Sequence, residues 1–253
     1  MQHLKWHLGQ HSKPPLKRQH GATLVEGLLA LAISVVMISA LVYLLVDGQT
    51  EMRAKNEAQR LTAFQRVAAQ YFTAERETLL GAMDASTQEE HEAAALACRI
   101  AVPASGEGGT PAYSSEKHTC MVDASFLRSR GLLPAGMSDT NAYGEKLIAI
   151  FRRIREKNEQ GQWVLSDNVD MVVLPVLAEG LSYTQHESRH AENLSTASMM
   201  GSTGGVIPDR DRGNCKAERS STTYEICGNG WRVQLGDFLT SDQLQAFSAL
   251  LPQ

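Results

Sequence analysis

Acidic residues are absent from the first 21 positions of this 253-residue chain, which instead contain Lys5, Lys13, Lys17 and Arg18. The whole chain has 24 basic and 28 acidic residues, so the remainder has 20 and 28, a net charge of −8. Nucleic-acid binding requires a basic surface, and an acidic remainder argues against it. At 43% apolar and 21% charged residues, the composition argues against wholesale disorder.

Proline is absent between Leu16 and Pro103, and this interval contains a long run that is almost free of charge. The run, Ala22–Val46, has 25 residues, no cysteine and one charged residue, Glu26. A membrane-spanning helix needs roughly 20 residues, so the run predicts a transmembrane segment. Because basic residues precede it, the positive-inside rule predicts a cytoplasmic N-terminus, with everything after Asp47 exported.

A cleaved secretory signal peptide is the alternative interpretation of the apolar run. Such a peptide has an apolar core of only ~7–15 residues, much shorter than the run found here. The chain also continues as Asp47-Gly48-Gln49, without a convincing small-x-small cleavage site. Both observations favour a membrane-spanning helix.

The helical pattern continues beyond the apolar run. Apolar residues recur in steps of three and four, which mark one face of an amphipathic helix: Leu61, Phe64, Val67 and Ala68, then Tyr71 and Phe72. We therefore expect one long helix from Ala22 to about Leu80. Residues 22–46 form its transmembrane half, and residues 47–85 contain its amphipathic half.

The remaining residues, 86–253, provide enough chain for one globular α+β domain. It is expected to begin with a short helix in 89–100, a Gly/Pro/Ser-rich connector at 101–115 and a helical turn at 123–131 closed by Gly131. Four strands are expected, at 146–155, 162–165, 171–177 and 231–235. A final helix, capped by Thr240 or Ser241, should follow the last strand. An antiparallel sheet packed against the long helix would bury the apolar sides of both.

Two details of the strands can be predicted. The turn KNEQGQ separates the first two strands, and we expect Trp163 and Val164 to face back on Ile148 and Ile150. Pro175 cannot donate a ladder hydrogen bond, so the strand that contains it is expected at a sheet edge.

The ten residues RQHGATLVEG, positions 18–27, connect the basic leader to the apolar run. A basic leader ending in Gly21, followed by Ala22-Thr23-Leu24-Val25-Glu26 and the apolar run, resembles the class III signal of type IV prepilins. The resemblance implies that a prepilin peptidase cuts after Gly21 and methylates Ala22, so that Glu26 matches the family's glutamate at the fifth mature position. The 21-residue leader is similar to those of the type IVb subgroup, whereas Ala22 departs from the bulkier first residue that is more common.

A second stretch, FLRSRGLLPAGMSDTNAYGEKLIAIFRRI at Phe126–Ile154, resembles the constant region of shufflon-type minor pilins, the PilV-like proteins of plasmid-encoded thin pili. GGVIPDRD, Gly204–Asp211, is also similar to that region. In this family a variable adhesin segment follows the constant region, and with the sequence ending at Gln253 we expect that segment to be absent or reduced.

The resemblance implies a pilin architecture, with a long helix packed against an antiparallel sheet, and a chain that is not an enzyme and needs no cofactor. It implies residence in the inner membrane before assembly and in an extracellular pilus afterwards. The partners implied are prepilin peptidase, the major pilin, other minor pilins and the inner-membrane assembly platform. Adhesion to a recipient-cell glycan or lipopolysaccharide during conjugation is a further implied role.

The cost of a charge in lipid gives Glu26 a physical role in this scheme. A carboxylate in the apolar core costs roughly 2.5–3.5 kcal/mol, and less near the interface, where Glu26 is expected. Packing of helices in a filament would bury it in protein, where it needs a cation. The family's usual account supplies the freed amine of Ala22 in an adjacent subunit. The alternative is a tolerated interfacial charge on a simple anchor.

The four cysteines are neighbours in sequence, Cys98 with Cys120 and Cys215 with Cys227. Export places them in an oxidising compartment, where disulfides persist. Four cysteines allow three connectivities, among which the sequence does not choose, and our hypothesis is the sequential one. A zinc site is the rival interpretation, but the cysteines lack the C-x₂₋₄-C spacing of structural sites. We therefore expect no metal.

HESRH, His186 to His190, matches the H-E-x-x-H signature of zinc metalloproteases. That chemistry needs His186 and His190 one turn apart on a helix, with Glu187 as the base. The flanking residues lack apolar periodicity, Arg189 brings a charge into the motif, and no third ligand is evident, so we expect a polar loop.

Two alternatives to a pilin follow from the sequence. The main alternative is a type II secretion pseudopilin, which shares the N-terminal signal, and a membrane-anchored zinc protease is a remote one. The glycine-rich GSTGG, residues 201–205, lacks the lysine of a phosphate-binding loop.

Overall fold

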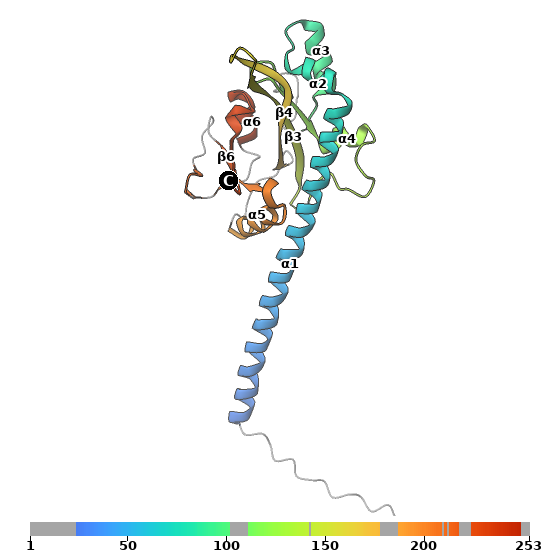
Figure 1. Ribbon diagram of the computed structural model, residues 1–253. Coiled ribbons are helices and arrows are strands. Elements are labelled where there is room, and N and C mark those ends of the chain that lie inside the picture. The colour runs from blue at the N-terminus through green and yellow to red at the C-terminus, as the bar shows by residue number, and fades with distance from the viewer. Residues whose placement is uncertain are drawn as a thin grey trace, which may run out of the picture. The chain divides into compact units, whose positions relative to one another are not determined.

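The computed structural model describes residues 24–101, 111–141, 143–177, 187–208, 210–211, 213–217 and 224–248 (Figure 1), with the backbone alone at 24–26, 47 and 187–190. The chain divides into two compact units, Met1–Gly48 and Gln49–Gln253. The predicted start of the long helix at Ala22 lies outside the described residues. The helix α1 (Leu24–Ala74) is described for 51 residues.

The part of α1 in the first unit is long and apolar enough to cross a membrane, by length and composition. The part in the second unit has one buried face, as its periodicity predicted. That face consists of residues at steps of three and four: Ala54, Ala58, Leu61, Phe64, Val67, Ala68 and Tyr71.

The long helix ends earlier than expected. α1 stops at Ala74, and α2 (Arg76–Met83) follows after the single residue Glu75. The backbone of Glu75 has φ −112° and ψ 26°, outside the helical range. The amide of Glu75 still donates to the carbonyl of Tyr71 at 2.9 Å, so the interruption is a local distortion between two helices. The prediction of one unbroken helix to Leu80 was wrong on this point.

Short helices follow where the sequence predicted them. α3 (Gln88–Ala97) begins with a capping box, in which Thr87 and Glu90 accept from each other's backbone amides. α4 (Ala124–Ser129) is capped by the carboxylate of Asp123, which accepts from the amide of Phe126 at 2.7 Å. Gly131, with φ 72°, lies in the turn that follows, as expected.

A four-stranded antiparallel sheet forms the centre of the second unit, in the order β1-β2-β3-β4. Its strands are β1 (Tyr113–Ser114), β2 (Thr119–Asp123), β3 (Glu145–Lys157) and β4 (Trp163–Leu177). β1 lies within the stretch predicted as a connector, which is a correction. The predicted strands at 162–165 and 171–177 are one strand, since β4 pairs with β3 along its length through a bulge between Arg153 and Arg155. β4 is at the edge of the sheet, as Pro175 predicted.

The predicted facing of the hairpin residues was wrong. Trp163 pairs with Lys157, and Val164 pairs with Glu156, near the end of the hairpin. The ammonium group of Lys157 lies 5.3 Å from the centre of the Trp163 ring. The partners of Ile148 and Ile150 are instead Leu174 and Val172, because the hairpin is longer than the sequence suggested.

Each face of the sheet is covered by a different layer. One face, with Val122, Ala149 and Phe151, packs against the buried face of α1. The other face, with Met121, Ile148 and Ile150, packs against the C-terminal part of the chain. The second unit therefore has three layers with two apolar cores, and Figure 1 shows β3 and β4 between α1 on one side and α6 on the other.

The C-terminal layer contains a second antiparallel sheet, in the order β5-β6-β7. Its strands are β5 (Gly205–Val206), β6 (Glu225–Gly228) and β7 (Arg232–Gln234), of which only the last was predicted. The indole of Trp231 lies so close over the sheet that a Cβ at Gly205 or Gly228 would come within 2.5 Å of it. α6 (Ser241–Ser248) begins after Thr240, whose hydroxyl accepts from the amide of Gln243, as predicted for a cap.

Candidate functional site

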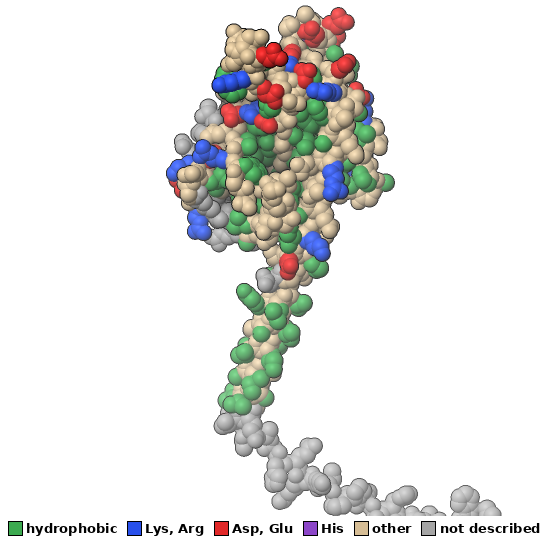
Figure 2. Space-filling view, in the orientation of Figure 1, with side chains coloured by type: hydrophobic (Ala, Val, Ile, Leu, Met, Phe, Trp, Pro, Cys, Tyr) green, Lys and Arg blue, Asp and Glu red, His purple; other side chains and the backbone are tan. Residues whose placement is uncertain are grey.

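The apolar part of α1 is the first candidate site. Its large side chains from Leu28 to Val46 are exposed, and Figure 2 shows hydrophobic side chains along the visible face of this part of the helix. The hydroxyls of Ser34 and Ser39 donate to the carbonyls of Ala30 and Val35, each at 2.8 Å. A hydroxyl satisfied within its own helix can enter an apolar environment at little cost. This part of α1 is therefore suited to lipid or to other apolar helices.

Of the three residues predicted for processing and assembly, Glu26 alone belongs to the described part of α1. Gly21 and Ala22 lie outside the described residues. Glu26 is in the first turn of α1 as described, and its side chain lies outside what the structure describes. The expected roles of these three residues remain predictions.

Two disulfides join the four cysteines in the sequential pairing expected from the sequence. Cys98 and Cys120, with Cα atoms 5.3 Å apart, link the end of α3 to β2 inside the core around α1. Cys215 and Cys227, with Cα atoms 6.2 Å apart, link residues 213–217 to β6. The first disulfide therefore joins a helix to the central sheet, and the second lies within the C-terminal layer.

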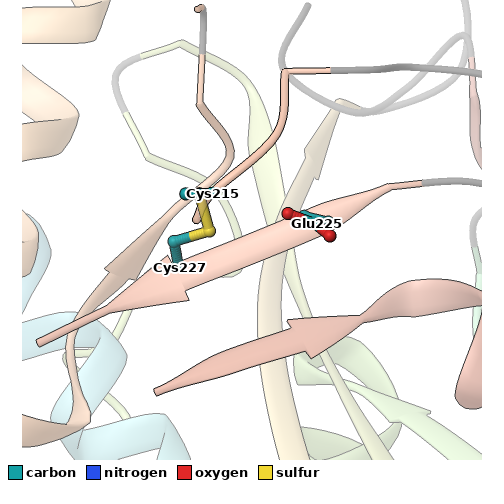
Figure 3. A group of neighbouring side chains, drawn as sticks. All are labelled: Cys215, Glu225 and Cys227. Carbon is teal, nitrogen blue, oxygen red and sulfur yellow. A yellow bond between two sulfur atoms is a disulfide. The ribbon is translucent and has the colours of Figure 1, made fainter. Parts of the chain in front are cut away.

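The second disulfide lies beside an acidic side chain, Glu225 (Figure 3). The ligand atoms of Cys215, Glu225 and Cys227 lie within 4.8 Å of one another, a spacing that a metal ion would need. With the sulfurs joined to each other, no thiolate is present to bind a metal. The carboxylate of Glu225 instead accepts from the amide of Lys216 at 2.7 Å and from the side chain of Gln234 at 2.9 Å. The cluster therefore ties the 213–217 segment to the second sheet.

The HESRH motif lies in part on a helix, which corrects the predicted loop. α5 runs over Glu187–Met199, while His186 lies outside the described residues, as do the side chains of residues 187–190. The buried positions of α5 are polar: Glu192 accepts from the hydroxyl of Tyr143, and the hydroxyl of Thr196 donates to the carbonyl of Ala54. A helix with polar buried positions has no apolar stripe, and this explains why its periodicity was missed.

A groove of about 460 Å³ in the second unit is the other candidate site. It is lined by residues of α1, β4, α5, β5, β6 and β7, and we call it the β4 groove because Asp170 to Pro175 line it without interruption. Figure 2 shows hydrophobic side chains in a hollow on this face of the domain. The volume is within the range of ligand-binding pockets. Its lining comes from segments far apart in sequence, so no local motif could have revealed it.

Acidic and apolar side chains together line the β4 groove. Glu57 receives two hydrogen bonds of 3.0 Å from Arg60, and Asp170 receives one of 2.9 Å from Arg152. Glu192 is 7% exposed and accepts from the hydroxyl of Tyr143. Burial and the hydrogen bond to Glu192 raise the pKa of Tyr143, so its phenol stays protonated at neutral pH.

No protein-family model, curated protein or solved structure matches this chain. What the chain does must therefore be inferred from its own residues and geometry.

Proposed function

We propose that this chain is a minor type IVb pilin, processed between Gly21 and Ala22 and incorporated into a thin pilus. The single observation that carries the proposal is the coincidence of a basic leader, a glycine, a glutamate five residues later and an apolar helix. Each feature alone is common. Together they describe a helix that must lose its leader before its N-terminus can enter an apolar assembly.

The second support is the continuity of α1 from an all-apolar part to a part with one buried face. A helix that is apolar on every side needs an apolar environment, first the membrane and then other helices. A helix with one buried face carries a globular domain. The chain thus combines an assembly helix and an α+β domain in one subunit, as a pilin does.

Glu26 has a specific role in this proposal. In the membrane it lies near the cytoplasmic interface, where its charge is tolerable. In the filament it would be buried among apolar helices and would pair with the methylated amine of Ala22 in an adjacent subunit. Removal of one partner from a buried ion pair costs about 3–5 kcal/mol, because the other charge stays buried and unpaired.

The domain would act at the pilus surface, in pilus initiation or in contact with a recipient cell during conjugation. The partners proposed are those of the resemblance: prepilin peptidase, the major pilin, other minor pilins and the assembly platform, with a recipient-cell glycan or lipopolysaccharide as the adhesion target. Prepilin peptidase would act while the chain is in the inner membrane.

The test compares Glu26→Leu with the unmodified chain and with a matched control, Glu51→Leu, which removes an exposed acid from the same helix after the apolar run. We expect leader removal to be normal in all three. Incorporation into sheared pili, measured by immunoblot, should fall by more than about tenfold in Glu26→Leu alone.

Incorporation of Glu26→Leu at the unmodified level would contradict the role of Glu26. Absence of the unmodified chain from sheared pili, with pilus number unchanged by its deletion, would contradict the pilin itself. A deletion that blocks protein secretion while pili stay normal would identify a type II secretion pseudopilin instead.

A further inference from the structure

The outer edge of β4 is open in the part of the chain that the structure describes. β4 is the last strand of its sheet, with β3 on its inner side. In an antiparallel edge strand, alternate residues direct their N–H and C=O groups away from the neighbouring strand. Among the described residues, no backbone–backbone hydrogen bond reaches residues 168–177 from the outer side, although the amide of Asn168 donates to the hydroxyl of Ser166 at 3.1 Å. An open edge of this length can pair with another strand.

The β4 groove follows this edge. Six consecutive residues, Asp170 to Pro175, line it, which means that it exposes both faces of the strand and the edge between them. Three residues of α1 also line it: Glu57, Leu61 and Gln65. Further lining residues come from α5 and from the segment between Ser202 and Ile207, which includes β5, the outer strand of the second sheet. The edge strands of both sheets therefore line one groove.

The charges of the residues that line the β4 groove indicate what kind of ligand it binds. Four acidic residues line it (Glu57, Glu145, Asp170 and Glu192), and none of the described lining residues is basic. Arg60 and Arg152, outside the lining, pair with Glu57 and Asp170. Glu192 accepts a hydrogen bond from a neutral group, the hydroxyl of Tyr143. Arg53, which does not line the groove, also hydrogen-bonds to the side chain of Tyr143. A cation entering the groove beside Glu192 would complement a buried carboxylate.

We infer that the β4 groove binds an extended, basic peptide segment of another protein by strand addition. The segment pairs with the outer edge of β4 as far as Pro175, which has no N–H to offer. Its apolar side chains meet the apolar lining, which includes Leu61, Val172 and Val233, and a lysine or arginine lies beside Glu192. Main-chain pairing supplies affinity in this mode of recognition, and the side-chain pockets supply selectivity. The inference stands independently of the pilin proposal.

The test uses the full-length protein in detergent micelles, panned against a phage-displayed library of random octapeptides. We expect enriched peptides with apolar residues at alternate positions and at least one lysine or arginine. A synthetic copy of the best peptide should slow amide hydrogen exchange in residues 168–177. A copy that is N-methylated at alternate residues cannot donate to the strand edge and should bind at least about tenfold more weakly.

Variants of the protein locate the binding. Glu192→Gln keeps an acceptor for Tyr143 but removes the charge, and should weaken the basic peptide about tenfold. Ala197→Trp fills the groove and should abolish binding. Glu159→Gln, an acid in the hairpin turn outside the groove, is the matched control and should bind normally. Circular dichroism confirms that each variant folds.

Three results would each overturn the inference. The library could yield no enriched peptide, the enriched peptides could leave residues 168–177 unprotected, or the N-methylated copy could bind as well as the parent. Unchanged affinity in Glu192→Gln would refute the requirement for a basic residue. Because the assay contains neither pili nor a prepilin peptidase, its failure leaves the pilin proposal standing, and failure of the pilin proposal leaves this result unaffected.

Discussion

The two parts of α1 differ in what surrounds their apolar side chains. From Leu28 to Val46 the large apolar side chains are 52–72% exposed, whereas the buried face from Ala54 to Tyr71 is 0–8% exposed. Both parts belong to one helix. The first is apolar on every side, and the second is apolar on one side, so the distribution of apolar residues decides which part the domain itself can cover.

The two parts of α1 are therefore stabilised by different surroundings. The second part of α1 is stabilised by the sheet, through apolar area buried within the same chain. The first part buries nothing against the described residues of its own unit, so its stability depends on an apolar environment outside that unit, which the proposal identifies as lipid or other subunits. A change in the second part should therefore act on folding of the domain, and a change in the first part should act on insertion and assembly.

The largest expected effect comes from Phe64→Ala. Phe64 is fully buried in the core between α1 and the sheet, and truncation of a buried phenylalanine costs about 3–5 kcal/mol. The matched change in the first part, Leu41→Ala, should alter unfolding of the domain by less than about 0.5 kcal/mol. Urea unfolding in detergent, followed by near-ultraviolet circular dichroism, measures both. Equal losses would mean that the two parts do not have separate roles.

Removal of the disulfides sharpens the comparison within the domain. Loop-closure entropy predicts a loss of about 3 kcal/mol for either disulfide, slightly more for Cys98–Cys120 because its separation is 22 residues rather than 12. The double variant C98A/C120A also removes buried sulfur from the α1 core, so it should lose more stability than C215A/C227A. The same urea assay measures the loss of unfolding free energy in both double variants. A larger loss in C215A/C227A than in C98A/C120A would contradict this prediction.

The smallest effect concerns a single hydroxyl in the second part of α1. The phenol of Tyr71 donates to the carbonyl of Ala97 at 2.9 Å, and burial raises its pKa above the ordinary value. A raised pKa in the folded state adds stability that is fully present below about pH 10 and is lost as pH rises through the folded pKa.

Tyr71→Phe should therefore cost about 1 kcal/mol at neutral pH and make the alkaline loss of stability less steep. It should not abolish that loss, since burial also raises the pKa of Tyr113 and Tyr143. Unfolding free energies measured between pH 7 and pH 11 test this. An unchanged alkaline slope in Tyr71→Phe would contradict the assigned cause.

The sequence predicted the elements whose residues repeat with a clear period. The steps from Leu61 to Tyr71 predicted the buried face of α1, and the expected cap at Thr240 or Ser241 predicted the start of α6, where the structure has Thr240 as the acceptor. The break at Glu75 could not be predicted in this way, because neither glycine nor proline marks it. β5 and β6 are only two and four residues long, and such segments become strands through their pairing rather than their composition.

The candidate sites were predictable to different degrees. The proposed assembly site is local in sequence, since Gly21, Ala22 and Glu26 lie within six residues of each other. The β4 groove combines residues from Glu57 to Phe238, and its acidic lining exists only after folding. α5, which contributes Glu192 to the groove, has polar residues at its buried positions, so its helical pattern was hidden as well.

The most direct test of the pilin proposal is the mass of the N-terminal peptide of the mature protein, isolated from cells that contain a prepilin peptidase. The proposal predicts a chain that begins at a methylated Ala22, and a Gly21 variant that keeps the leader. A mature chain that retains residues 1–21, or one that begins after Val46, would contradict it.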